Sequence, residues 1–180
     1  KPFQSKLQKV RLVWRELPRP VISVLHGHCL GGGLQLALAT DIRIATADCQ
    51  FAIMEAKWGL VADMGLTQSA MGVLRADIVK ELAMTARIFD GQQAFDYGVV
   101  SHLSDTPMEV AKNLVAELSN RSPDAILASK RITNAMYHTP ATTLYQEKLW
   151  QIKLLLGQNR KLAVKKAKDE TVKFIGRQFN

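Results

Sequence analysis

The feature that most constrains the fold of this chain is a run of three glycines at positions 31, 32 and 33. They follow an apolar, β-branched run at 21–25, which predicts a strand buried on both faces and ending at His26 and Gly27. They precede a segment of strong helix formers at 34–39. The sequence therefore predicts a strand, a glycine turn, and a helix whose N-terminus lies at the glycines.

Strand and helix patterns alternate over the first part of the chain, and only helical patterns follow. This order predicts an α/β core over residues 1–120 and an all-helical region over 121–180, which packs on the core or contacts another subunit. The expected strands are 21–25, 42–45, 51–54 and 99–103, with a loop at 57–66. The expected helices are 4–17, 67–74, 77–85, 91–97, 107–120, 123–136, 141–156 and 161–175.

Composition narrows the class of protein. Apolar stretches are too short for a membrane span, and the charged N-terminus does not resemble a secretory signal. The net charge is +8, but the basic residues are spread out and only 165–168 is dense, so nucleic-acid binding is not favoured. Cys29 and Cys49 form no disulfide framework, which indicates a reducing compartment, and we expect the cytoplasm.

Backbone chemistry gives the glycine turn one candidate function. Glycines at a helix N-terminus let free N–H groups approach an anionic group closely. The run lacks the P-loop ending and the G-x-G-x-x-G spacing, so it predicts neither a mononucleotide nor a dinucleotide site. A purely structural tight turn explains the same residues.

Two carboxylates, Glu55 and Asp63, bracket a second candidate region. The apolar residues between them, including Trp58, suggest partial burial, and burial drives the pKa values of neighbouring carboxyls apart, as acid and base catalysis requires. Surface carboxylates of no catalytic role are the alternative. His26, His28 and Cys29 have no second cluster at metal-ligand spacing, so we expect no metal.

Together these motifs resemble the crotonase (enoyl-CoA hydratase/isomerase) superfamily over about residues 21–103, including DIR at 41–43 and GQQAFDYGVVSHL at 91–103. The resemblance implies a ββα spiral core, a C-terminal helical trimerisation region, and a homotrimer or hexamer. It also implies an acyl-CoA thioester substrate, with CoA entering as part of the substrate and no other cofactor. The N-terminal part of the family domain, which supplies one oxyanion donor, lies outside this chain.

Residue by residue, the resemblance makes the Gly32 N–H the second oxyanion donor and Glu55 an acid/base. Typical hydratases carry a second glutamate where this chain has Gln35, whereas the family's dienoyl-CoA isomerases match Glu55 and Asp63. A double-bond isomerase is therefore expected. A 2-enoyl-CoA hydratase using Glu55 alone and a non-catalytic acyl-CoA-binding relative are the alternatives. The expected substrate contacts are His28, Leu30, Gly31, Gln35 and Trp58.

Overall fold

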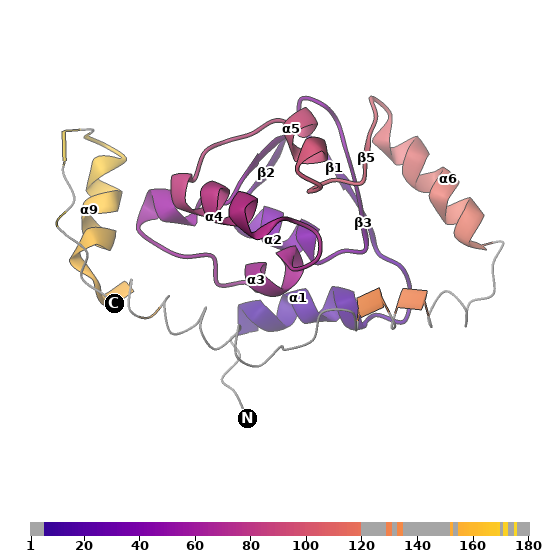
Figure 1. The fold of residues 1–180 in the computed structure, drawn as a ribbon, viewed down its shortest axis with the longest axis horizontal. Helices are drawn as coiled ribbons and strands as arrows, with labels where there is room; N and C mark the ends of the chain where they lie inside the picture. The colour runs from indigo at the N-terminus through magenta and orange to yellow at the C-terminus, as the bar shows by residue number, and fades with distance from the viewer. Residues whose placement is uncertain are drawn as a thin grey trace.

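Two small parallel sheets form the centre of the protein in this computed structural model (Figure 1). One sheet has the order β1-β3-β5 and the other pairs β2 with β4. The strands are β1 Ile22–Leu25, β2 His28–Leu30, β3 Ile42–Ala45, β4 Gln50–Ala52 and β5 His102–Leu103. The structure describes residues 6–119, 129–130, 133–134, 152, 155–169, 171–172 and 175.

Helices connect the strands because parallel neighbours need a crossover. In Figure 1, α2 and α3 lie between the sheets and α1, while α6 packs against β1 and β3 and α9 lies beside η1. Among the described residues, no helix combines the length and apolarity that crossing a membrane requires. The helices are α1 Lys6–Glu16, α2 Gly32–Leu38, α3 Leu66–Ala70, α4 Ala76–Thr85, α5 Gly91–Asp96, α6 Pro107–Ser119, α9 Gln158–Lys166 and the 3-10 helix η1 Glu55–Trp58.

The core lies between the strands and the helices that cover them. Phe51 of β4 stacks on Phe89, with ring centroids 5.7 Å apart, and the backbones of these residues exchange two hydrogen bonds of 2.8 and 2.9 Å. Gly91 then starts α5 against the backbone of residues 46–47, where an added Cβ would lie 2.3 Å from the Thr46 carbonyl oxygen. This close approach explains why the position requires glycine. Other fully buried core side chains are Leu34, Ile44, Ile53, Leu82 and Val99.

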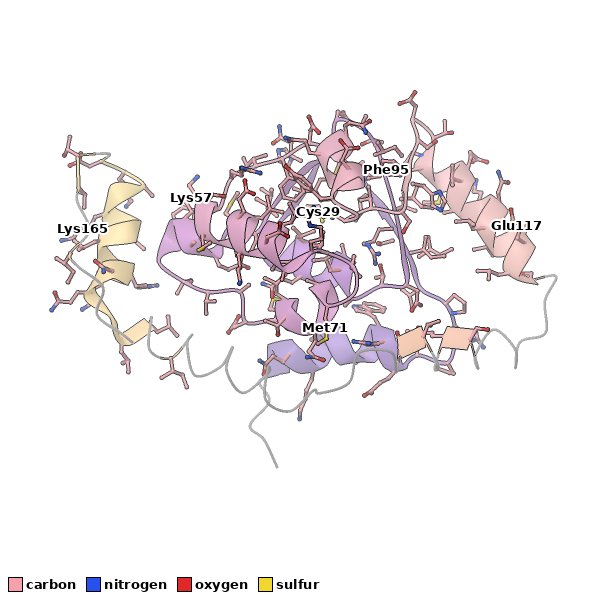
Figure 2. The ribbon with its side chains drawn as sticks, viewed as in Figure 1. Cys29, Lys57, Met71, Phe95, Glu117 and Lys165 are labelled. Carbon is pink, nitrogen blue, oxygen red and sulfur yellow. The ribbon has the colours of Figure 1, made fainter. Side chains whose placement is uncertain are left out.

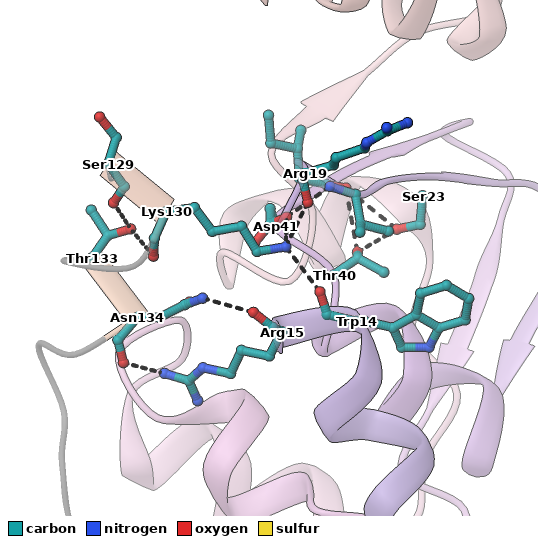
Figure 3. A network of polar contacts seen from close by, with 12 residues as sticks. Trp14, Arg15, Arg19, Ser23, Thr40, Asp41, Ser129, Lys130, Thr133 and Asn134 are labelled. Atoms are coloured by element: carbon teal, nitrogen blue, oxygen red, sulfur yellow. Dashed lines mark hydrogen bonds and ion pairs between the residues drawn. The ribbon is translucent and has the colours of Figure 1, made fainter. Parts of the chain in front are cut away.

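A buried lysine ties a C-terminal segment to the core (Figure 3). The Lys130 side chain is only 6% exposed, and its Nζ lies 2.8 Å from Asp41 Oδ2. The same Nζ donates to the carbonyl oxygens of Trp14 at 2.9 Å and Arg19 at 2.8 Å. Asp41 also accepts a 2.7 Å hydrogen bond from the Val21 N–H. The ammonium therefore has three acceptors, as burial of a charge requires.

Several predicted boundaries were wrong. β2 lies where only a turn was expected, because its three residues are flanked by positive-φ glycines, Gly27 and Gly31, that mask the strand pattern. The predicted loop at 57–66 begins inside η1, and the helix predicted over 67–74 already ends at Ala70. Strand β4 ends at Ala52, and β5 starts only at His102, because residues 99–100 instead cap α5 with hydrogen bonds to the Ala94 carbonyl.

The C-terminal predictions are tested only in part. The helix predicted over 161–175 starts earlier, at Gln158, and ends at Lys166. Asn159, near the start of α9, is joined to Ile175 by two hydrogen bonds. Its side chain accepts from the Ile175 N–H at 3.0 Å and donates to the Ile175 carbonyl at 3.1 Å. The helices predicted over 123–136 and 141–156 lie largely outside the described residues.

Candidate active site

The glycine turn and Glu55 meet because two parallel strands end side by side. β2 and β4 pair in register, with Leu30 opposite Ala52, so the residues after each strand leave the same edge of the sheet. The Gly31 N–H donates to the Ala52 carbonyl at 2.8 Å and fixes this junction. A Cβ built on Gly31 would lie 3.5 Å from Glu55 Oε1. The carboxyl ends of parallel strands are where α/β sheets place ligand sites.

Gln35 joins Glu55 to the loop that carries Asp63. Its side chain is 1% exposed on α2, one helical turn after Gly31. Its Nε2 donates to Glu55 Oε1 at 2.6 Å, and its Oε1 accepts from the Met64 N–H at 2.9 Å. One neutral amide therefore positions both the glutamate and the residue that follows Asp63.

Glu55 is half-buried, and burial raises the pKa of its carboxyl above the usual value. The hydrogen bonds from its own backbone and from Gln35 act against this shift, while the charge of Asp63 adds to it. Its Oε2 is buried and has no hydrogen-bond partner in the described part of the chain. A carboxyl with a raised pKa and one uncommitted oxygen is suited to accept and return a proton.

Asp63 is half-buried in the loop between η1 and α3, and its effect on the Glu55 pKa places the two carboxyls within electrostatic range of each other. This interaction raises the Glu55 pKa because ionising the second of two nearby carboxyls costs more than ionising the first. The catalytic roles of Glu55 and Asp63 stay predictions.

The Gly32 N–H is the first of α2, where no intrahelical acceptor exists. The Met64 side chain covers this residue, since a Cβ built on Gly32 would lie 2.9 Å from Met64 Sδ. The sulfur is the far end of a flexible methionine side chain, which can change rotamer at little cost. Met64 therefore lies against Gly32 and donates its N–H to Gln35, and Gln35 in turn donates to Glu55.

The other predicted substrate contacts lie at the margin of this region. Leu30 and Gly31 lead directly into α2, while His28 is exposed at the start of β2. Trp58 is 39% exposed on η1, and the Lys57 Nζ lies 5.5 Å from the centroid of its ring. Lys57 points to the side of the molecule on which Lys165 of α9 also lies (Figure 2). The roles of His28 and Trp58 in substrate binding stay predictions.

Within the described parts of the chain, no group of three metal-ligating side chains comes together. Burial is the main cause that raises the pKa of the Cys29 thiol to about 12 and of the Cys49 thiol to about 11. Both cysteines are free and Cys29 lies in the middle of the molecule (Figure 2). Thiols so protonated pack as small apolar groups.

A hollow of about 320 Å³ lies elsewhere, at the C-terminal end of α2, whereas Gly32 lies at its N-terminal end. Arg15 beside it is held by the Asn134 carbonyl at 2.7 Å, and the Asn134 side chain returns a 3.2 Å hydrogen bond to the Arg15 carbonyl (Figure 3). Arg43 donates to the carbonyls of Val99 at 2.6 Å and Thr40 at 2.7 Å. The guanidinium groups of Arg15 and Arg43 thus hold backbone carbonyls. Because the hollow and Gly32 lie at opposite ends of α2, the hollow is separate from the candidate active site.

The sequence predicted Gln35 as a residue lining the pocket, but it did not predict that Gln35 bridges Glu55 and Met64. The only local signal is its spacing of four residues from Gly31, which places both on one side of the turn that starts α2. The contact with Met64 joins residues 29 positions apart, and no periodic pattern encodes such a contact.

Comparison with known proteins identifies a family for this chain. Residues 1–167 match the model of the family described as "Enoyl-CoA hydratase/isomerase". A mouse protein named Delta(3,5)-Delta(2,4)-dienoyl-CoA isomerase, mitochondrial, is 36% identical over 162 residues, which is 86% of this chain and 49% of that protein. A mouse protein named methylglutaconyl-CoA hydratase, mitochondrial, is 34% identical over 139 residues, covering 74% of this chain and 44% of that protein.

Among solved structures, an enoyl-CoA hydratase from Mycobacterium avium subsp. paratuberculosis K-10 superposes with a TM-score of 0.82 at 20% identity. The superposition covers 95% of this chain and 71% of that one. At this identity the likeness concerns the fold. The chain spans about half the length of the curated relatives it matches.

Proposed function

Because the chain belongs to the enoyl-CoA hydratase/isomerase family, we propose that it forms the catalytic part of an enzyme that moves a double bond in an enoyl- or dienoyl-CoA. The observation that carries this proposal is the environment of Glu55. Its nearest side-chain partner is the neutral amide of Gln35, and the second carboxyl of the region belongs to Asp63. That arrangement supplies two proton-transfer groups but no pair of glutamates to hold a water.

In the proposed reaction, one carboxylate takes a proton from the carbon between the thioester carbonyl and the double bond, and the C–H electron pair forms an extended enolate. The Gly32 N–H stabilises the negative charge on the thioester oxygen, which for one such donor contributes roughly 10²–10³ in rate. The other carboxyl then delivers a proton to the remote carbon, and the double bond has moved. Glu55 and Asp63 carry these two steps, and no cofactor beyond the CoA of the substrate takes part.

The assembly and location are part of the same proposal. A homotrimer or hexamer is the expected assembly, with the region 121–180 at subunit contacts. The free, buried cysteines support a reducing compartment such as the cytoplasm, and relatives named mitochondrial make the mitochondrial matrix the alternative. Light scattering of the full-length protein and cell fractionation test these two points.

The reaction is tested by incubating the full-length protein with 2-enoyl-, 3-enoyl- and 3,5-dienoyl-CoA in heavy water. Mass spectrometry then gives the masses of the products. Isomerisation gives a moved double bond with deuterium incorporated and no added water. A product heavier by one water identifies a hydratase, the second candidate, which the mouse hydratase relative favours. Binding of the thioesters without any turnover identifies a non-catalytic acyl-CoA-binding protein.

Substitution of either carboxylate tests the assigned residues. We expect Glu55→Gln and Asp63→Asn each to lower isomerisation at least ~10²-fold, because each removes one proton-transfer group. Asp96→Asn, on the exposed side of α5, makes the same chemical change away from the site and should leave turnover unchanged. Wild-type turnover in Asp63→Asn would remove Asp63 from the mechanism.

A further inference from the structure

The hydrogen bonds around Gln35 determine which way its amide faces. The Met64 backbone N–H can only donate, so the atom of Gln35 that it contacts at 2.9 Å must be the carbonyl oxygen. The NH₂ group must then face Glu55, where it lies 2.6 Å from Oε1. This assignment rests on the direction of a backbone donor, and it removes the usual ambiguity between the oxygen and nitrogen of a side-chain amide.

The same logic extends to Glu55. Because the Gln35 NH₂ donates to Oε1, this oxygen must keep a lone pair toward the amide and cannot carry a proton in that direction. The other oxygen, Oε2, is buried, and no hydrogen-bond partner for it lies among the residues that the structure describes. The two oxygens of one carboxyl are therefore in unequal environments.

We propose that Gln35 is a positioning residue that gives the two oxygens of Glu55 different tasks: Oε1 is a fixed acceptor, and Oε2 alone exchanges the proton with the substrate. This inference rests on the proposed function for its chemical meaning. The proton taken from the substrate carbon bonds to Oε2 as the C–H pair enters the extended enolate, and it leaves from Oε2 when Glu55 is reset. Gln35 itself gains and loses no proton.

Gln35 also links the position of the Glu55 carboxyl to that of Asp63. Its carbonyl holds the Met64 N–H, directly after Asp63 in the chain, so the amide sets the spacing of the two carboxyls across one short bridge. A carboxylate at position 35 can still accept from Met64 but cannot donate to Oε1 while ionised. It would instead share a proton with Glu55 and add a like charge beside it.

Two substitutions test the proposal through the pH dependence of kcat/KM. Gln35→Leu removes the donor to ionised Glu55, and Gln35→Glu replaces that donor by a like charge. Both should move the acid limb of the profile to higher pH, by about one unit, because each disfavours the ionised base. We expect kcat to fall more than tenfold with a smaller change in KM. Gln92→Glu, an exposed change of the same kind on α5, should leave the profile in place.

An infrared measurement separates this inference from the proposed reaction. The wild-type minus Glu55→Gln difference spectrum at acid pH isolates the C=O stretch of protonated Glu55, whose carbonyl is Oε1 if the proton lies on Oε2. Loss of the Gln35 donor should shift this band to higher frequency in Gln35→Leu. The measurement needs no substrate, so it stands even if wild-type protein isomerises no thioester.

The outcomes are decisive in both directions. A shifted band together with a shifted acid limb supports the assignment, and a shifted band in a protein without turnover overturns the proposed function alone. An unmoved band in Gln35→Leu overturns the assignment. If Gln35→Leu fails to fold, Gln35→Glu, which keeps the acceptor for the Met64 N–H, carries the test, and an unmoved acid limb in that variant overturns the assignment.

Discussion

Glu55, the proposed acid/base, carries a cost to folding. Burial raises the pKa of its carboxyl in the folded protein, so between its unfolded and folded pKa values the native state binds more protons than the unfolded chain. Stability therefore falls as pH rises through that window, and the full cost remains at higher pH. Sites tuned for proton transfer commonly carry such a cost.

Glu55→Gln should remove this pH-dependent cost. We expect the variant to unfold at a higher temperature than wild type above the folded pKa of Glu55, and to lose this advantage as the pH falls below the unfolded value. Melting curves across this range, monitored by circular dichroism, measure the difference. An equal difference in melting temperature at all pH values would show that Glu55 is not perturbed by folding.

Gly32 offers a second test at the scale of single residues. An alanine Cβ would lie 2.9 Å from Met64 Sδ, so Gly32→Ala should push the Met64 side chain and its loop away while keeping the backbone N–H donor. We expect turnover to fall roughly tenfold to a hundredfold, because small displacements at a reacting centre are costly. Adding Met64→Ala should restore most of the loss. No recovery in the double variant would place the defect in the turn itself.

At the scale of elements, Lys130 connects three segments that are distant in sequence: the end of α1, the chain entering β1, and Asp41 before β3. Removing one member of a buried ion pair leaves the other charge without its partner. Lys130→Ala should therefore lower the free energy of unfolding by about 3 kcal/mol, the lower end of the usual range, since Asp41 keeps the Val21 N–H and some exposure.

Urea unfolding measures this loss, and two comparisons define its origin. Asp41→Asn combined with Lys130→Met should recover part of the stability, because no unpaired charge remains. Lys112→Ala on α6 removes an exposed ion pair with Glu109 and should change stability by less than about 1 kcal/mol. Equal losses in Lys130→Ala and Lys112→Ala would contradict the structural role assigned to Lys130.

The sequence predicted best those elements that are determined by residues close together in the chain. β1 follows from β-branched residues, and the start of α2 follows from glycines before helix formers. β2 escaped prediction because three residues between two positive-φ glycines carry no periodicity. α9 ends early although helix formers continue, because hydrogen bonds between Asn159 and Ile175 fold the chain back. Likewise, Glu55 and Asp63 were predictable as residue types, but the Gln35 bridge depends on tertiary packing.

At the scale of the whole chain, the net charge of +8 predicts how the rate of encounter with the proposed acyl-CoA substrate depends on salt. An acyl-CoA carries several phosphate charges, and long-range attraction to a cationic protein weakens as salt screens it. We expect KM for an acyl-CoA to rise several-fold between about 0.05 and about 0.5 M KCl. The matching acyl-pantetheine, which lacks phosphates, should show little change, and an equal rise for both thioesters would exclude this explanation.

The amide at position 35 also has a genetic consequence. Glutamine and glutamate codons differ by a single base, and the carbonyl oxygen that accepts the Met64 N–H is present in either side chain. The backbone can therefore accommodate both residues without rebuilding α2 or the loop. A site with one carboxyl beside the glycine turn and a site with two are thus neighbours in sequence space, so a single point mutation is a short evolutionary route between the proposed isomerase site and a site with two glutamates.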